Sequence, residues 1–206
     1  MYRKAIIKTL LLAMISVTGI LAGPCTKAAW AQVLVVGPDN DPRIEATREA
    51  VAFWNRTLSE LGLSFRLGAV SHSSKTIPAD YLRTLSAQVL GGGRSGPFSA
   101  DVQALPGNIV VALSDGDFVS FTARGQSKTL IGIRSNRLYP LTLPNVPRNV
   151  IAHELGHAIG LRHNSDPAML MCGRPAPCRP DAFKSATSRF FPLTDSDKAQ
   201  LTRMYR

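Results

Sequence analysis

Residues 153–163 read HELGHAIGLRH and carry three of the four histidines of this chain. His153 and His157 are four positions apart, so on a helix both side chains lie on one face and can reach the same ion. Neutral imidazole is a good zinc ligand. Gly160 tolerates a positive φ angle and allows a sharp turn after the helix, which brings His163 back as a third ligand. The spacing therefore predicts a three-histidine zinc site.

Glu154 adds a general base to this site. It adjoins the first predicted ligand and would accept a proton from the water that attacks a substrate. The pattern specifies five positions, and its chance occurrence in a chain of this length is about one in ten thousand if each position is a random draw. The alternative is an amphipathic helix with incidental histidines. The fourth histidine, His72, lies in a serine-rich segment and is expected to be solvated.

The N-terminal residues 1–31 are predicted to be a signal peptide. Three basic residues precede an apolar run over 9–22, and Ala-Trp-Ala at 29–31 has the small-x-small form of a cleavage site. The apolar run is shorter than the roughly 20 residues of a membrane span, although an uncleaved anchor is the alternative. We therefore expect one domain, residues 32–206, that is secreted or periplasmic and has no stable membrane anchor.

Charge and cysteine content narrow the function of this domain. The full chain has a net charge of +10, and the four basic residues lost with residues 1–31 leave +6. No basic run is interleaved with aromatic residues, so a nucleic-acid partner is not indicated. Cys172 and Cys178 remain in the domain. An even pair in an exported protein predicts a disulfide, which would contribute about 2 kcal/mol by closing a short loop.

Hydrophobic periodicity predicts an α+β domain. The predicted strands cover 33–36, 63–67, 108–113, 118–122 and 129–134. The predicted helices cover 42–61, 81–89, 150–159 and 193–205. Asp41 is expected to cap the first helix, because Pro42 suits a first helical position. Residues 138–147 contain three prolines and are expected to be irregular.

The chain resembles the metzincins, and within them the catalytic domain of the matrixins. The zinc motif matches at all five fixed positions, and Met171 follows His163 by eight residues, which is the spacing of the matrixin methionine turn. The segment 193–205 resembles the matrixin C-terminal helix, in which Asp197 would support that turn. Asn164 differs from the Ser or Thr that matrixins usually carry after the third histidine.

This resemblance implies a zincin fold with a twisted, mostly parallel sheet of about five strands and three main helices. The zinc helix would face an active-site cleft. One zinc ion would be bound by the three histidines, with Glu154 as the catalytic residue and Met171 as a hydrophobic floor beneath the metal. The edge strand that holds an extended peptide is expected at 129–134, with 118–122 as the alternative.

The resemblance implies a secreted zinc endopeptidase, expected to be a bacterial monomer without a pro-segment, that acts on polypeptides. The alternatives are a zinc-containing protein that holds a polypeptide without cleaving it, and a zinc hydrolase of non-peptide amides. The specificity pocket is expected after Met171, with Pro175, Pro177 and Phe183 as candidates.

Calcium is a second candidate ion. Asp115 and Asp117, or Asp39 and Asp41, could supply oxygen ligands, although acidic residues beside Gly or Pro often mark plain turns.

Overall fold

Five strands and five helices make up the part of the chain that the structure describes. This computed structural model describes residues 30–93, 96–137, 139–173, 178 and 187–206. In order, the elements are β1 (Trp30–Val36), α1 (Pro42–Glu60), β2 (Arg66–Ser73), α2 (Ala79–Leu90), α3 (Ala100–Ala104), β3 (Ile109–Leu113), β4 (Phe121–Arg124), β5 (Thr129–Ile133), α4 (Asn145–Ala158) and α5 (Asp195–Tyr205). The predicted signal peptide lies outside the described residues, except for its last two.

The strands form one sheet in the order β2-β1-β3-β5-β4. The neighbours from β2 to β5 pair in parallel, and only β4 runs antiparallel, beside β5. β3 has the sequence IVVAL and is buried at all five positions. A strand of this kind is typical of a parallel sheet that is covered on both faces. The predicted five-stranded, mostly parallel sheet is confirmed.

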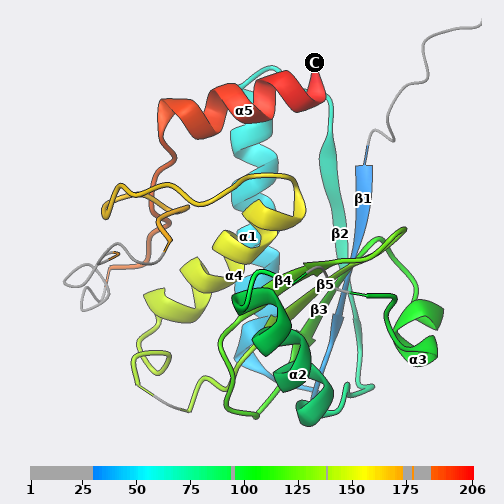
Figure 1. The fold of residues 1–206 in the computed structure, drawn as a ribbon. Helices are drawn as coiled ribbons and strands as arrows, with labels where there is room; N and C mark the ends of the chain where they lie inside the picture. Colours follow the sequence, from blue (N-terminus) through cyan, green and yellow to red (C-terminus); the bar gives the residue numbers. More distant parts are fainter. Residues whose placement is uncertain (1–29, 94–95, 138, 174–177, 179–186) are drawn as a thin grey trace, which may run out of the picture.

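Two hydrophobic clusters cover the two faces of this sheet. The larger one joins the sheet to α1, α4 and α5, and it contains Trp54, Leu155 and Met171. The indole N–H of Trp54 donates to the carbonyl of Ala152 at 2.9 Å, which ties α1 to α4. The smaller cluster joins the opposite face to α2 and α3. Figure 1 shows α5 (red) at the top of the view, above α1 and α4, and α2 at the bottom.

Several element boundaries differ from the sequence predictions. β2 begins at Arg66 rather than at residue 63, and α3 was not predicted. The predicted irregular segment is helical from Asn145, because Pro147 falls in the first turn of α4, where its missing N–H is not needed. The start of the helix that carries the histidines was therefore predicted five residues too late, because Pro147 was read as a sign of irregular structure.

His72 was predicted wrongly as a solvated loop residue. It lies on β2 and is half-buried, with Nε2 at 3.0 Å from the carbonyl oxygen of Gly37. β2 is an edge strand of the sheet, and polar residues are tolerated there because one side of the strand faces solvent. The serines around His72 therefore belong to an edge strand and not to a loop. None of the helices in the described ranges is long and apolar enough to cross a membrane.

Candidate metal centre

The three histidines of the motif converge on one point. His153 and His157 project from α4, and His163 follows the turn after this helix. Their Nε2 atoms lie 3.1 Å (His153 to His157), 3.1 Å (His153 to His163) and 2.9 Å (His157 to His163) apart. Zinc–nitrogen bonds of 2.0–2.1 Å in a tetrahedron would place such atoms about 3.3 Å apart. The spacing of the donors therefore fits a zinc ion.

Hydrogen bonds to the other ring nitrogens define which atoms face the ion. Nδ1 of His153 lies 2.7 Å from the carbonyl oxygen of Leu170, and Nδ1 of His157 lies 2.9 Å from that of Leu161. A carbonyl only accepts, so in both rings the proton sits on Nδ1 and the Nε2 lone pair points at the cluster. Lone pairs that converge in this way repel one another unless a cation lies between them.

Burial keeps two of these imidazoles in the neutral, metal-binding form. It lowers the pKa of His157 to about 4, and the nearby His163 and Arg124 add to this effect. Burial also lowers the pKa of His163. Near neutral pH both rings are therefore free of the second proton that would compete with a metal ion.

The turn at Gly160 returns the chain to the metal centre. Gly160 has a φ angle of +112°, which L side chains rarely adopt. A β-carbon at this position would lie 2.6 Å from Sδ of Met204 on α5. The carbonyl of Gly160 also accepts a hydrogen bond from Gln200 at 2.8 Å. Backbone conformation and the proximity of α5 both call for glycine here.

Met171 packs beneath the histidine helix. It is fully buried, and its sulfur lies 2.6 Å from the place of a β-carbon on Gly156, so α4 approaches it closely only because residue 156 is glycine. The carbonyl of Met171 accepts a hydrogen bond from the backbone N–H of Asn164 at 2.9 Å. The methionine segment is thereby joined to the residue that follows the third histidine.

Asp197 and the cysteine pair support the same segment. The Asp197 carboxylate accepts a hydrogen bond from the side chain of Asn164 at 2.9 Å. Cys172 and Cys178 form the predicted disulfide, with their Cα atoms 5.6 Å apart. The candidates for the specificity pocket, Pro175, Pro177 and Phe183, lie outside the described residues.

Glu154 lies beside the cluster and is 7% exposed. Burial raises the pKa of its carboxyl to about 7, although the hydrogen bond from Thr122 opposes this shift. The distance from Thr122 Oγ1 to Glu154 Oε2 is 2.7 Å. A carboxyl group with this pKa can both accept and release a proton near neutral pH, as a general base must.

The edge of the sheet beside α4 is β4, and the prediction of an edge strand at 129–134 is wrong. β5 lies inside the sheet, between β3 and β4. The alternative at 118–122 shares only residues 121 and 122 with β4. Both strands of the hairpin have apolar residues, and only the parallel pairing of β3 with β5 decides which one lies outside. No local pattern in the sequence reports that pairing.

Thr122 and Arg124 attach this edge strand to α4. The hydroxyl of Thr122 lies 2.9 Å from the carbonyl oxygen of Glu154, and the guanidinium of Arg124 donates to the carbonyl of His157. The two residues are two positions apart on β4, so both side chains point to the same face of the sheet. No motif in the sequence singled out either residue, because their contacts depend on how the sheet is assembled.

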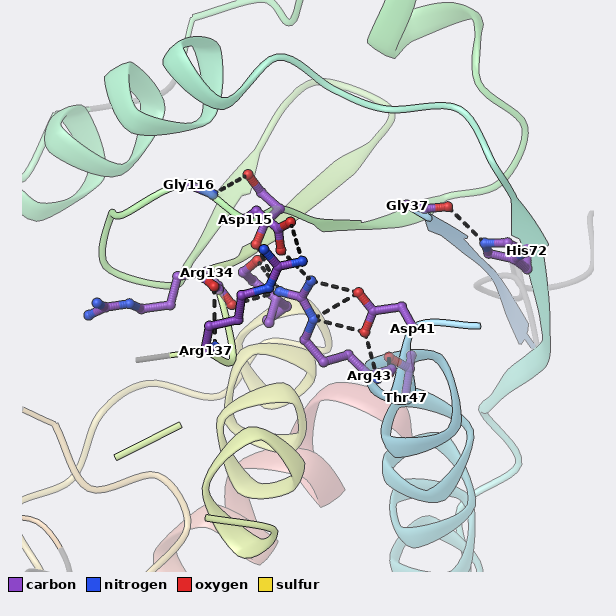
Figure 2. A network of polar contacts seen from close by, with 12 residues as sticks. Gly37, Asp41, Arg43, Thr47, His72, Asp115, Gly116, Arg134 and Arg137 are labelled. Atoms are coloured by element: carbon purple, nitrogen blue, oxygen red, sulfur yellow. Dashed lines mark hydrogen bonds and ion pairs between the residues drawn. The ribbon is translucent and has the colours of Figure 1, made fainter. Parts of the chain in front are cut away.

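The structure does not support the calcium site. Arginines occupy the carboxylates that were candidate ligands: Arg43 lies 2.6 Å from Asp41, and Arg137 lies 3.1 Å from Asp115. Arg134 pairs with Asp117 in the same way, at 2.6 Å. Figure 2 shows Arg43 beside Asp41, with Asp115, Arg134 and Arg137 close by. Within the described ranges, the three histidines are the one group of His, Cys, Asp or Glu side chains placed to hold a metal ion.

The fold of this chain is similar to that of a solved archaemetzincin. The chain is similar to an archaemetzincin from Methanopyrus kandleri, at 17% identity and a TM-score of 0.50, over 87% of this chain and 97% of that one. It also matches metalloproteinase-II from Bacteroides fragilis, at 12% identity and a TM-score of 0.45, over 85% of this chain and 53% of that one. A zinc-dependent peptidase from Methanocorpusculum labreanum matches at 14% identity and a TM-score of 0.38, over 82% and 99%.

At these identities the likeness concerns the fold alone. No family model matches the sequence. A search of curated proteins finds no match either. The resemblance to metzincins is therefore supported at the level of the fold, whereas nothing in the comparisons favours the matrixins among them.

Proposed function

We propose that this protein is a secreted zinc endopeptidase with a matrixin-like arrangement of its site. The observation that carries the proposal is the convergence of three imidazole Nε2 atoms beside one buried carboxyl group, Glu154. The signal-like segment at residues 1–31 supports export. The archaemetzincin-like fold supports a peptidase rather than another kind of zinc protein.

The residues of this chain divide the chemistry among them. His153, His157 and His163 hold the zinc ion, which supplies Lewis-acid activation of the water and of the scissile carbonyl when bound. Glu154 accepts a proton from the attacking water and passes it to the amine of the departing peptide. Its pKa of about 7 suits both transfers. Burial excludes competing water from this carboxyl group.

Substrate binding is assigned to the edge strand β4. This strand ends the sheet on the side of α4, and an extended peptide can add to such an edge through main-chain hydrogen bonds. Thr122 and Arg124 attach β4 to the helix that carries two of the ligands. A peptide bound along β4 would therefore lie at a defined distance from Glu154.

Replacement of Glu154 by glutamine tests this function. We predict that Glu154→Gln keeps zinc near one ion per chain but cleaves a denatured protein about 100- to 10,000-fold more slowly, the usual effect of losing a general base. The amide has the same shape but cannot take up the proton. Bound zinc is measured by elemental analysis, and cleavage is followed with and without a zinc chelator.

Glu60→Gln is the matched control, because Glu60 is an exposed residue at the end of α1, a different helix from the one that carries His153 and His157. This variant should cleave like the wild type. Near-normal turnover by Glu154→Gln would refute the assigned role of the base. Well-folded wild-type protein without zinc would refute the metal centre, and zinc-loaded protein that cleaves no substrate would favour a protein that only binds polypeptides.

A further inference from the structure

The carboxyl group of Glu154 has one partner in the part of the chain that the structure describes. Thr122 Oγ1 lies 2.7 Å from Glu154 Oε2, and no other described group forms a hydrogen bond with this carboxyl. Thr122 comes from β4, 32 positions earlier in the sequence, and is half-buried. The partner of the proposed base is therefore supplied by the proposed substrate-binding strand.

The same hydroxyl has a second acceptor within reach. Thr122 Oγ1 also lies 2.9 Å from the backbone carbonyl oxygen of Glu154. A threonine hydroxyl carries one proton and two lone pairs, so it donates to one acceptor at a time and can also accept. Both acceptors belong to one residue, which means that rotation of the hydroxyl proton is enough to switch between them.

This geometry serves both forms that the base passes through during a reaction. Before proton uptake, the Thr122 hydroxyl donates to the ionised carboxylate. The proton from the water is taken up by the other carboxyl oxygen, so Oε2 remains an acceptor and the Thr122 hydroxyl keeps its hydrogen bond. The carboxyl group thus stays hydrogen-bonded in both forms without movement of any heavy atom.

We propose that Thr122 is a positioning residue that fixes the orientation of the Glu154 carboxyl group, because its hydroxyl lies within hydrogen-bond distance of both the carboxyl and the backbone carbonyl of that residue. This inference rests on the proposed function and deepens it. The side chain of Thr122 contacts Glu154, and its assigned role is to act through that residue. Its bond to the carbonyl of Glu154 also couples the edge strand to α4, so the base and the bound peptide share one anchor.

Three variants test the inference. Thr122→Val keeps the shape and suits a strand but removes the hydroxyl, whereas Thr122→Ser keeps the hydroxyl. Thr202→Val is the matched control, because Thr202 is also half-buried and donates to a backbone carbonyl, that of Lys198, but lies on α5. For each variant, kcat and KM are measured on a peptide, and the zinc dissociation constant is measured by chelator competition.

We expect Thr122→Val to lower kcat about 10- to 100-fold, with KM and zinc affinity within about twofold of the wild type, as for other residues that orient a reactive group. Thr122→Ser should recover most of the loss, and Thr202→Val should show none. A merely structural role would instead weaken zinc binding together with kcat. If Thr122→Val does not fold, Thr122→Ala is expected to show the same loss in kcat.

An infrared measurement reads the hydrogen bond without any activity. The carboxyl band that is absent in Glu154→Gln belongs to Glu154, and it should shift in Thr122→Val but not in Thr202→Val. An unshifted band, or an unchanged kcat in Thr122→Val, would overturn the inference. If zinc-loaded wild-type protein cleaves nothing, the proposed function fails, and the band position still decides separately whether Thr122 holds the carboxyl group.

Discussion

Gly173 shows how a residue without a side chain can define the place of a metal ligand. Its backbone N–H donates to the carbonyl of Asn164 at 3.0 Å, so its position is held by the segment after the third histidine. A β-carbon on Gly173 would lie 2.2 Å from Cγ of His163. The imidazole of His163 therefore fills the space that a larger residue at 173 would need.

We predict that Gly173→Ala weakens zinc binding about 10- to 100-fold, the usual cost of disturbing a group that orients a ligand. The added methyl group must displace the ring of His163. Chelator competition measures the dissociation constant. Gly96→Ala is the matched control, because a β-carbon at that position has nothing within 4 Å. Equal zinc affinity of the two variants would contradict the prediction.

The residues that could be predicted from the sequence share one property, their closeness along the chain. The three histidines lie within residues 153–163, where helix geometry and one glycine turn set their spacing. Thr122 could not be found in this way, because its contact with Glu154 depends on the order of strands in the sheet. Gly173 could not be predicted for a similar reason, because its contact with His163 depends on how the chain folds back after Met171.

At the scale of elements, the first turn of α5 supports the segment that carries the third histidine. The Thr194 hydroxyl accepts from the backbone N–H of Asp197, and the Asp197 carboxylate accepts from that of Thr194, both at 3.0 Å. The same carboxylate oxygen accepts from the side chain of Asn164. One buried carboxylate thus joins the start of α5 to the residue beside His163.

We predict that Asp197→Ala lowers the free energy of unfolding by about 2 to 3 kcal/mol, because one of the two hydrogen bonds of the capping box is lost and the amide of Asn164 loses its acceptor. Denaturant unfolding of the zinc-free protein measures the change. Asp195→Ala is the control: Asp195 lies in the same helical turn, is solvent-exposed and, among the described residues, pairs only with Lys198. A loss in Asp195→Ala as large as in Asp197→Ala would show that the network does not contribute.

The elements themselves were more predictable than their arrangement. Apolar strands such as β3 and the amphipathic α1 follow from local periodicity, and Asp41 caps α1 as its sequence suggests. The order of the strands does not follow from any window of sequence, because it is determined by which strands pair across long separations. For this reason the sequence points wrongly to 129–134 as the edge strand of the sheet.

At the scale of the whole molecule, Arg43 connects α1 to the sheet. Its guanidinium donates to the carbonyls of Ser114 and Arg134, which follow β3 and β5, at 2.9 and 2.8 Å. It also pairs with Asp41 at 2.6 Å, and Figure 2 shows these contacts together. The side chain of Arg43 is almost fully buried. One cation therefore joins the first helix to two neighbouring strand ends.

We predict that Arg43→Met lowers the free energy of unfolding by about 3 to 5 kcal/mol, the usual cost of removing one partner of a buried ion pair. The carboxylate of Asp41 would lose its hydrogen bonds from the guanidinium, and the carbonyls of Ser114 and Arg134 would lose this donor. Arg48→Met is the control, because Arg48 lies on the same helix, is half-exposed and, within the part of the chain that the structure describes, pairs only with Glu45. Its effect should stay within about 0.5 kcal/mol. A loss below about 1 kcal/mol in Arg43→Met would contradict the assigned role.

The same ion pair predicts how stability depends on acid. Burial raises the pKa of Asp41, but the hydrogen bonds and charge of Arg43 outweigh it and hold the pKa below its usual value of 3.8. The stability that this carboxylate contributes is therefore fully present above pH 3.8 and is lost as the pH falls through the lower pKa of the folded state. In Arg43→Met the backbone N–H of residue 43 and the charge of Arg137 still lower the pKa of Asp41, but the side-chain hydrogen bonds and the charge of Arg43 are lost, so this pKa should be higher than in the wild type. Denaturant unfolding of the wild type and of Arg43→Met between pH 6 and 3 measures this effect. The difference in their free energies of unfolding should become smaller as the pH falls. A constant difference would show that Arg43 does not affect the ionisation of Asp41.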